Sequence, residues 1–172
     1  MVRDPELESR RRIHQTIQQH PGLHFRELLG RVALAQGTLQ YHLHGLEADG
    51  LVAVSQDGGF TRYYATTRVR PEDRPLMDAL RREYARRILA HLVAEGPLTT
   101  QALSERIGKA PSTVSWHISR LVDAGLLTRT RAAQEVRYAL VDRDRVLYLY
   151  TTFRGSFTDR LVDRLLGLWD SY

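Results

Sequence analysis

The sequence has no cysteine, a single lysine and no long run of hydrophobic residues. The absence of cysteine excludes disulfides, thiolate metal ligands and cysteine nucleophiles. The hydrophobic runs are a few residues long, whereas a membrane-spanning helix needs about 20 apolar residues. The first residues also lack the apolar core of a signal peptide. We therefore expect a cytoplasmic protein.

Positive charge is carried almost entirely by arginine, because Lys109 is the one lysine among 25 basic residues. The formal net charge of +5 is compatible with a polyanionic partner. Arginine suits contacts to phosphate and guanine, although a GC-rich genome produces the same bias. Residues 141–172 carry as many acids as arginines, which predicts that this tail binds protein while the remainder binds something acidic.

One stretch of the chain occurs twice. Residues 12–65 can be laid over residues 87–140 without a gap, at a constant offset of 75. A register kept over this length indicates one small domain present in two copies. The identical positions are Arg12 and Arg87, Ile13 and Ile88, Leu23 and Leu98, Leu28 and Leu103, Arg31 and Arg106, Ala35 and Ala110, Thr38 and Thr113, His42 and His117, Leu46 and Leu121, Gly50-Leu51 and Gly125-Leu126, and Arg62-Tyr63 and Arg137-Tyr138.

Each copy is predicted to form three helices followed by a two-stranded hairpin. In the first copy, Asp4-Pro5 is a helix-start signal and His20-Pro21-Gly22 is a stop signal. The hairpin turn is predicted at Gln56-Asp57-Gly58-Gly59. The expected elements are a helix from Pro5 to about Gln19, helices at Phe25–Val32 and Gln36–Asp49, and strands at Leu51–Ser55 and Phe60–Thr66.

A linker with two prolines and several charges, residues 67–75, should separate the copies. We expect the first domain at residues 1–66, the second at 76–141 and a C-terminal helical segment at 142–172. The expected elements of the second copy are helices at Leu76–Ala94, Thr100–Ile107 and Pro111–Ala124, and strands at Leu126–Arg131 and Glu135–Val141.

The third helix of each copy has one apolar stripe and one unusual polar face. A rotation of 100° per residue places Leu39, Leu43 and Leu46 on the stripe, as it does Val114, Ile118 and Leu121 in the second copy. His42 and His117 fall beside the stripe, which favours a packing role. On the opposite face an aromatic residue, Tyr41 or Trp116, lies among small hydroxyl residues, a composition that suits entry into a DNA major groove.

These helices also carry a family signature. Thr38-Leu39-Gln40-Tyr41-His42-Leu43 is followed by Leu46 and by Gly50-Leu51; Ser112-Thr113-Val114-Ser115-Trp116-His117-Ile118 is followed by Leu121 and by Gly125-Leu126. With Arg62-Tyr63-Tyr64 after the hairpin turn, the pattern resembles the recognition helix and wing of ArsR/MarR-type winged helix–turn–helix regulators. Two modules with a helical tail are similar to two-module regulators common in archaea.

The resemblance implies a mainly α fold with small β wings, built of two tandem winged helix–turn–helix domains plus the C-terminal helical segment. It also implies a sequence-specific regulator that binds double-stranded DNA, with helices at about 36–49 and 111–124 in the major groove and wings on the backbone. The wing arginines suit phosphate contacts and a solvated strand surface equally well. The candidate DNA-binding residues are Thr38, Gln40, Tyr41, His44, Arg62, Lys109, Ser112, Thr113, Ser115, Trp116, Ser119, Arg120, Arg129, Arg131 and Arg137.

The two copies differ in charge, and the chain departs from the metal-sensing members of the family. The first recognition helix has no arginine or lysine and its wing turn contains Asp57, whereas the second copy has Lys109 and Arg120. We therefore expect the second copy to bind DNA more strongly. Without cysteine, and without histidine after His117, the family's sensing sites cannot be carried over, so we expect no metal and no cofactor.

The tail is predicted to join two chains into a homodimer. Its apolar residues recur at spacings of three and four, which predicts one or two amphipathic helices with a break at Gly155. They cover more of a helix than one neighbour would bury, so packing on a second chain is favoured over packing within the chain. The candidate dimerisation residues are Phe157, Leu161, Leu165, Leu168 and Trp169.

Catalysis is not expected. A catalytic triad needs a nucleophile and a base that is oriented by a third group, whereas the serines and histidines of this sequence lie on elements that are explained otherwise. The sequence also has no glycine-rich phosphate loop. Two alternatives to a specific regulator remain open. One is a protein-binding tandem winged helix subunit of a transcription or chromosome complex. The other is a protein that coats DNA without sequence preference. Salt-sensitive DNA binding distinguishes the first from a regulator, and different affinities for chosen and random duplexes distinguish the second.

Overall fold

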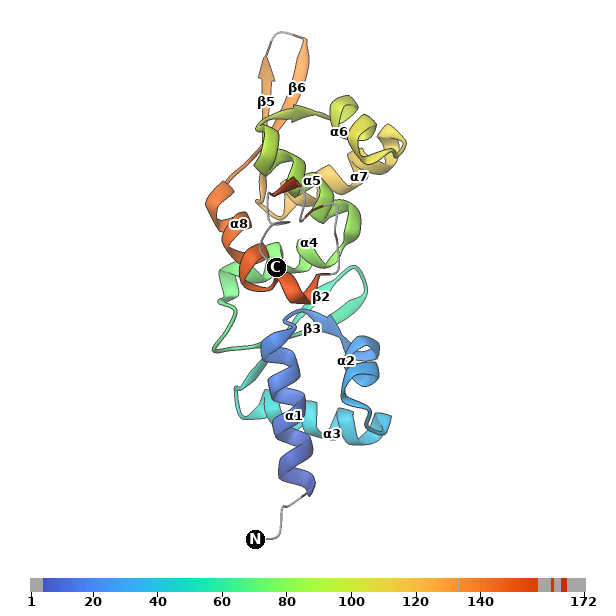
Figure 1. Cartoon of the computed structure of the whole chain (residues 1–172), viewed down its shortest axis with the longest axis vertical. Coiled ribbons are helices and arrows are strands. Elements are labelled where there is room, and N and C mark those ends of the chain that lie inside the picture. The colour runs from blue at the N-terminus through green and yellow to red at the C-terminus, as the bar shows by residue number, and fades with distance from the viewer. Residues whose placement is uncertain (1–4, 133, 158–161, 163–164, 167–172) are drawn as a thin grey trace. The chain divides into compact units, whose positions relative to one another are not determined.

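The computed structural model describes residues 5–132, 134–157, 162, 165 and 166. The chain divides into two compact units, Met1–Asp78 and Ala79–Tyr172. Each unit contains a small three-stranded antiparallel sheet among helices, so the fold is mainly helical with β wings, as the sequence predicted (Figure 1).

The first unit has the order of a winged helix–turn–helix. Its central strand β3 pairs with β1 on one side and with β2 on the other, and the β2–β3 hairpin is the wing. Gly58 and Gly59 both have positive φ, 57° and 86°, as a two-residue hairpin turn requires. The elements are α1 (Pro5–Gln19), β1 (Leu23–His24), α2 (Phe25–Val32), α3 (Gln36–Ala48), β2 (Val52–Asp57), β3 (Phe60–Ala65) and the short η1 (Pro71–Asp73).

The second unit repeats these elements at the offset of 75 that the sequence shows. Strand pairing repeats as well: Leu23 pairs with Tyr63 in the first unit, and Leu98 pairs with Tyr138 in the second. The elements are α4 (Arg74–Arg81), which spans the division between the units, then α5 (Glu83–Glu95), β4 (Leu98–Thr99), α6 (Thr100–Ile107), α7 (Pro111–Asp123), β5 (Leu127–Ala132), β6 (Glu135–Leu140), α8 (Arg143–Thr152) and the short η2 (Arg154–Ser156).

The same positions form the core in both units. Every apolar residue of the predicted stripes on α3 and α7 is buried, and so are their partners on the preceding helices and the wing. A fully buried side chain of this size stabilises the fold by about 1.5–3 kcal/mol relative to exposure. The matched core residues are Ile13 and Ile88, Ile17 and Leu92, Leu28 and Leu103, Leu39 and Val114, Leu43 and Ile118, Leu46 and Leu121, and Val52 and Leu127.

The predicted single helix at Leu76–Ala94 is wrong, because the chain breaks between α4 and α5. Arg82 is extended there, with φ −94° and ψ 122°. The buried Arg86 donates from Nη1 to the carbonyl oxygen of Leu80 at 2.7 Å, which supplies a partner to a carbonyl near the end of α4. The segment expected as a linker is not wholly exposed, since Val69 and Asp73 are buried.

The beginning of the tail packs within its own unit. Asp142 accepts a hydrogen bond from the backbone N–H of Arg145 at 2.8 Å and so caps α8. Val146, Leu149 and Tyr150 of α8 are buried, and α8 lies against α5. The helix ends at Thr152, before Gly155.

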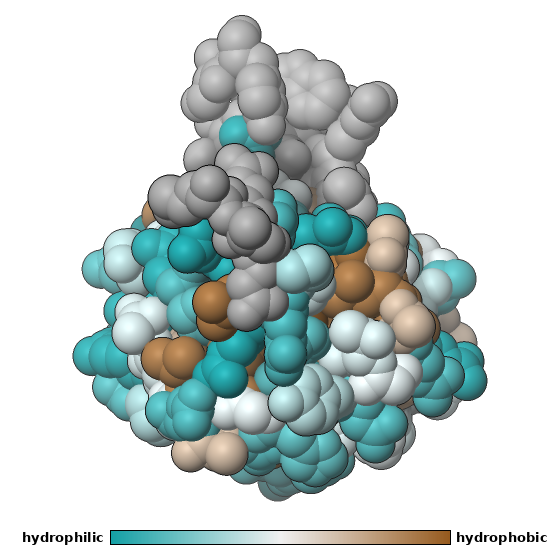
Figure 2. Space-filling view, turned by 90° about the horizontal axis from the view of Figure 1, so that it is seen from below, coloured by the Kyte–Doolittle hydropathy of each residue, from teal (hydrophilic) through white to brown (hydrophobic). Residues whose placement is uncertain are grey.

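Within the described residues, no helix is long and apolar enough to cross a membrane. The face shown in Figure 2 is mainly hydrophilic, and its hydrophobic residues form small separate groups.

Candidate nucleic-acid interface

Helices α3 and α7 occupy equivalent places and present equivalent faces. Tyr41 is 66% exposed and Trp116 is 55% exposed, so both aromatic rings are at the surface and not in the core. The neighbouring histidines differ, with His42 buried and His117 half-buried. The candidate recognition residues on these helices are all exposed apart from Arg120, which is half-buried; they are Thr38, Gln40, Tyr41, His44, Ser112, Thr113, Ser115, Trp116, Ser119 and Arg120.

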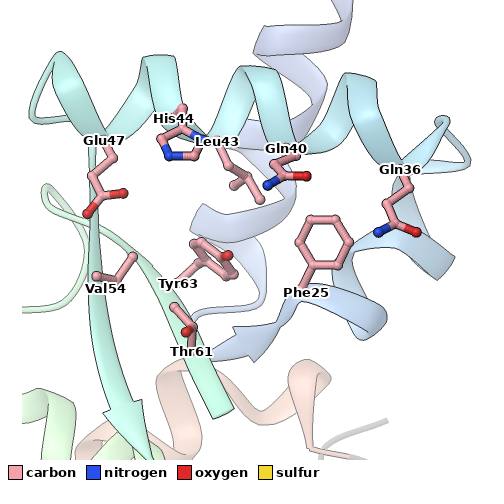
Figure 3. A pocket seen from close by; sticks show the side chains of 9 residues that line it. All are labelled: Phe25, Gln36, Gln40, Leu43, His44, Glu47, Val54, Thr61 and Tyr63. Carbon is pink, nitrogen blue, oxygen red and sulfur yellow. The ribbon is translucent and has the colours of Figure 1, made fainter.

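One side of α3 faces the wing across a cleft. Val54 of β2 and Thr61 and Tyr63 of β3 line this cleft together with residues of α3 (Figure 3). Because side chains alternate along a strand, Arg62 and Tyr64 point to the opposite face of the sheet. The wing therefore has one face toward the recognition helix and one face away from it.

In the second unit, the same register places two arginines on the helix-facing side of the wing. Arg129 pairs with Tyr138, as Val54 pairs with Tyr63, and Arg131 pairs with Val136, which is equivalent to Thr61. Both arginines are exposed. Within the described part of the chain, neither forms an ion pair. Their guanidinium groups are thus available to a phosphate near α7.

The other two wing arginines are placed differently from the prediction. Arg62 is 6% exposed; its Nε donates to Asp57 at 2.9 Å and its Nη1 donates to the carbonyl oxygen of Gly22 at 2.9 Å. Arg62 is therefore a structural residue of the first wing and is not presented to DNA. Arg137 is exposed, but it is at the position equivalent to Arg62, on the face away from α7, and it pairs with Glu135 at 3.1 Å.

The opposite side of α7, toward the start of α5, also carries positive charge. The Lys109 ammonium lies 5.3 Å from the centre of the Tyr84 ring, and the Arg120 guanidinium lies 4.9 Å from the Trp116 ring. Arg82 is close enough to Arg120 to matter electrostatically: burial first, and then the charge of Arg120, lower the pKa of Arg82. Burial and these two arginines likewise lower the pKa of His117.

Sequence reasoning missed Arg82 and Tyr84 in this cluster. Both belong to the turn and helix that precede the repeat match, where the first copy has Leu7 and Ser9 at the equivalent positions. The two consecutive arginines Arg81 and Arg82 could have indicated a basic surface here. However, the predicted continuous helix over Leu76–Ala94 did not place Arg82 beside α7.

Among the described residues, the two sides of α3 in the first unit carry no arginine or lysine comparable to those around α7 apart from Arg10, which is paired. On the side toward α1, a groove is lined by Leu7, Tyr41 and Gly45 among others, and its arginine, Arg10, pairs with Asp49. On the wing side, Glu47 lines the cleft and Arg62 is buried elsewhere. The lower DNA affinity expected of the first copy from its sequence stays a prediction, but the structure extends the charge difference to both sides of the helix.

The sequence predicted that Phe157 packs on a second chain, but this residue is buried within its own unit. Its ring stacks on Tyr150 with 5.5 Å between the ring centres, and the Arg81 guanidinium lies 5.0 Å from its centre. Leu165 is half-buried. The calls on Leu161, Leu168 and Trp169 lie outside the described residues.

Two family models match this chain in tandem. Residues 7–76 match HTH_HVO_0163_N, described as an N-terminal HTH domain, and residues 81–128 match a winged helix-turn-helix DNA-binding domain. Among curated proteins, no sequence matches this chain.

Solved structures of winged helix proteins are similar over about half of the chain. HlyU from Vibrio cholerae, in its reduced form, is 25% identical over 49% of this chain and 87% of HlyU, with a TM-score of 0.42. The transcriptional repressor BigR from Xylella fastidiosa is 26% identical over 48% of this chain and 86% of BigR, with a TM-score of 0.42. NolR from Sinorhizobium fredii is 25% identical over 49% of this chain and 82% of NolR, with a TM-score of 0.43.

The fold and the two family models define the class: the chain is built from two tandem winged helix–turn–helix modules, the second of which matches a DNA-binding domain. Its particular combination is an N-terminal module of the HTH_HVO_0163_N type followed by a winged helix-turn-helix DNA-binding module.

Proposed function

We propose that the protein is a sequence-specific transcriptional regulator that binds double-stranded DNA mainly through its second module. The observation that supports this assignment is the positive charge on both sides of α7. DNA phosphates border the major groove on both sides, so a helix in that groove meets a phosphate backbone along each of its edges.

In this proposal the two sides of α7 and its exposed face have different tasks. Arg129 and Arg131 of the wing contact phosphates on one side, and Lys109, Arg120 and Arg82 contact phosphates on the other. Between them, the small residues Ser112, Ser115 and Ser119 allow close approach to the base edges, and Trp116 provides an apolar contact surface in the groove.

Selection of bound duplexes from a random pool, using the full chain, tests this function. We expect enrichment of a defined sequence, and an affinity for it whose logarithm falls linearly with the logarithm of salt concentration, by about 0.9 per phosphate contact. Affinity that does not respond to salt would contradict DNA binding and favour a protein partner. Salt-sensitive binding without enrichment would favour a DNA-coating protein.

We also propose that two chains associate through the tail. Because Phe157 is buried within its own unit, it is not part of the proposed interface. Leu161, Leu165, Leu168 and Trp169 recur at helical spacing in the sequence. Sedimentation of the full chain and of a Leu165→Asp, Leu168→Asp variant tests the proposal. We expect a dimer and a monomer respectively; a wild-type monomer at micromolar concentration would overturn it, and the regulator would then bind DNA as a monomer.

A further inference from the structure

The cleft between α3 and the wing of the first unit is a concave site that DNA binding by the second unit does not use. We call it the wing cleft. Its volume is about 310 Å³, at the lower end of the range of small-molecule sites. The residues that line it are Phe25, Gln36, Gln40, Leu43, His44, Glu47, Val54, Thr61 and Tyr63.

The wing cleft combines an apolar floor with polar groups that point toward it. Gln36, Gln40 and Glu47 extend from α3 toward the side occupied by Phe25 and Tyr63 (Figure 3). Within the described part of the chain, the side chains of these three α3 residues have no hydrogen-bond or ion-pair partner. Their donors and acceptors are therefore available to a bound molecule.

The charge of the wing cleft favours a positively charged ligand. Glu47 is the one acid among the lining residues, which include no arginine or lysine. Burial first, and then the negative charge of Glu47, raise the pKa of Tyr63, which places the carboxylate within electrostatic reach of the phenol. The faces of Phe25 and Tyr63 also attract cations.

Comparison with the second unit shows that this chemistry belongs to the first unit alone. At the equivalent positions, Val122 replaces Glu47 and Arg129 replaces Val54. The second unit therefore lacks the carboxylate and has an additional cation at these positions. The region between α7 and the wing of the second unit suits a phosphate, whereas the wing cleft of the first unit repels one.

We propose that the wing cleft of the first unit binds a small organic cation, an amine attached to a flat apolar body. The ammonium group pairs with Glu47, and the apolar body lies on Phe25 and Tyr63. This inference does not require DNA binding by the second unit, because the cleft is lined by residues of the first unit.

Nuclear magnetic resonance of the full chain without DNA tests the site, at slightly alkaline pH where histidine side chains are neutral in water. The probes are benzylamine, the neutral benzyl alcohol and the anion benzoate. Benzylamine should give saturable shifts at amides of α3 and β3 in the millimolar range, benzyl alcohol should bind more weakly, and benzoate should give no shifts there. Absent shifts with benzylamine, or equal binding of benzoate, would overturn the proposal.

Two variants assign the effect to the wing cleft. Glu47→Gln should weaken benzylamine binding roughly tenfold or more, because it removes a charged partner. Glu8→Gln, which removes an exposed acid of α1 outside the cleft, should have no effect. The double variant Glu47→Val with Val54→Arg introduces the second unit's residues and should reverse the preference to benzoate. Unchanged benzylamine binding in Glu47→Gln would place the amine elsewhere and overturn the site.

Discussion

The two units share the elements of the repeat at the same offset and bury most of the same core positions, yet the charges around their third helices differ. Around α7 lie Arg82, Lys109, Arg120, Arg129 and Arg131, and around α3 lie Leu7, Glu47 and an arginine already paired with Asp49. The buried residues that specify the fold are therefore separate from the surface residues that specify what the fold binds. A duplicated domain can keep the first set and change the second.

The largest expected effect concerns the matched arginines Arg62 and Arg137. Arg62→Ala removes the cation that lies between the buried carboxylate of Asp57 and the half-buried carboxylate of Asp78, so we expect the first unit to lose about 3–5 kcal/mol of stability. Arg137→Ala removes an exposed pair with Glu135 and should change stability by less than about 1 kcal/mol. Hydrogen exchange at β3 and β6 measures the two effects separately; equal losses would contradict the assigned difference.

The next effect concerns the wing of the second unit. Arg129→Ala combined with Arg131→Ala should reduce the salt dependence of DNA binding by about 1.8, that is about 0.9 for each lost phosphate contact. Affinity should fall for all sequences alike, because phosphate contacts carry no base information. Arg137→Ala is the matched control and should leave the slope unchanged. A larger change in the control would mean that the wing approaches DNA with its other face.

Substitutions on the recognition helices compare the modules directly. Ser115→Ala and Trp116→Ala should relax the preference for particular bases, with each base contact worth about 1–3 kcal/mol. Gln40→Ala and Tyr41→Ala, at the equivalent positions of α3, should have smaller effects. Competition between the selected duplex and single-base variants measures the preference. Greater losses from the α3 substitutions would make the first module the principal DNA-binding module.

A smaller effect is expected where α2 and α6 end. Ala33 adopts a left-handed conformation with φ 49°, and Gly108 adopts it at the equivalent position with φ 69°. A residue with a Cβ atom pays about 1–2 kcal/mol for this conformation. Ala33→Gly should therefore stabilise the first unit and Gly108→Ala should destabilise the second, each by about 1 kcal/mol. Denaturation curves with the same sign for both variants would contradict this account.

The smallest effect is a dependence on acid at the Glu95–Arg106 pair of the second unit. Arg106 first, and then His91, lower the pKa of Glu95 by hydrogen bonding. A lowered carboxylate pKa adds stability that is complete above the ordinary glutamate pKa and is lost as the pH falls through the lowered value. The contribution is small because the site is exposed to solvent. At the equivalent positions of the first unit, Arg31 contacts His20, so this contact contains no carboxylate.

Stability of the second unit measured against pH, in the wild type and in Arg106→Ala, checks this expectation. The variant should lose less stability between neutral and acid pH than the wild type. Identical pH profiles would show that the Glu95–Arg106 pair adds nothing to folding.

The helices and strands of the repeat were predictable from the sequence. The constant offset of 75 aligns the two copies, and the spacing of apolar residues within each copy depends on local sequence. The candidate recognition residues on α3 and α7, apart from the half-buried Arg120, are exposed as predicted, for the same reason. The burial of Arg62 was not predictable from its own copy, because one of its two acids, Asp78, lies beyond the repeat in α4. Asp57 and Asp78 correspond to Ala132 and Phe153 in the second unit, and their absence there leaves Arg137 at the surface.

The break between α4 and α5 had a similar origin. Leu76, Leu80, Tyr84, Ile88 and Leu92 have the spacing of one continuous helix. The interruption depends on the side chain of Arg86 reaching the carbonyl oxygen of Leu80, a contact that periodicity cannot represent. The position of Arg82 beside α7 follows from that break.

Asp78 accepts hydrogen bonds from the hydroxyl groups of Ser55 and Tyr64, and Tyr64 is fully buried. A fragment of the first module that stops at the end of β3 would remove the acceptor that Asp78 provides to both hydroxyl groups, which should destabilise the wing. Recombinant boundaries for this module should therefore lie beyond Asp78. Protease cleavage between Thr66 and Arg70 should destabilise the β2–β3 wing, although the wing precedes the cleavage site, because Asp78 follows that site.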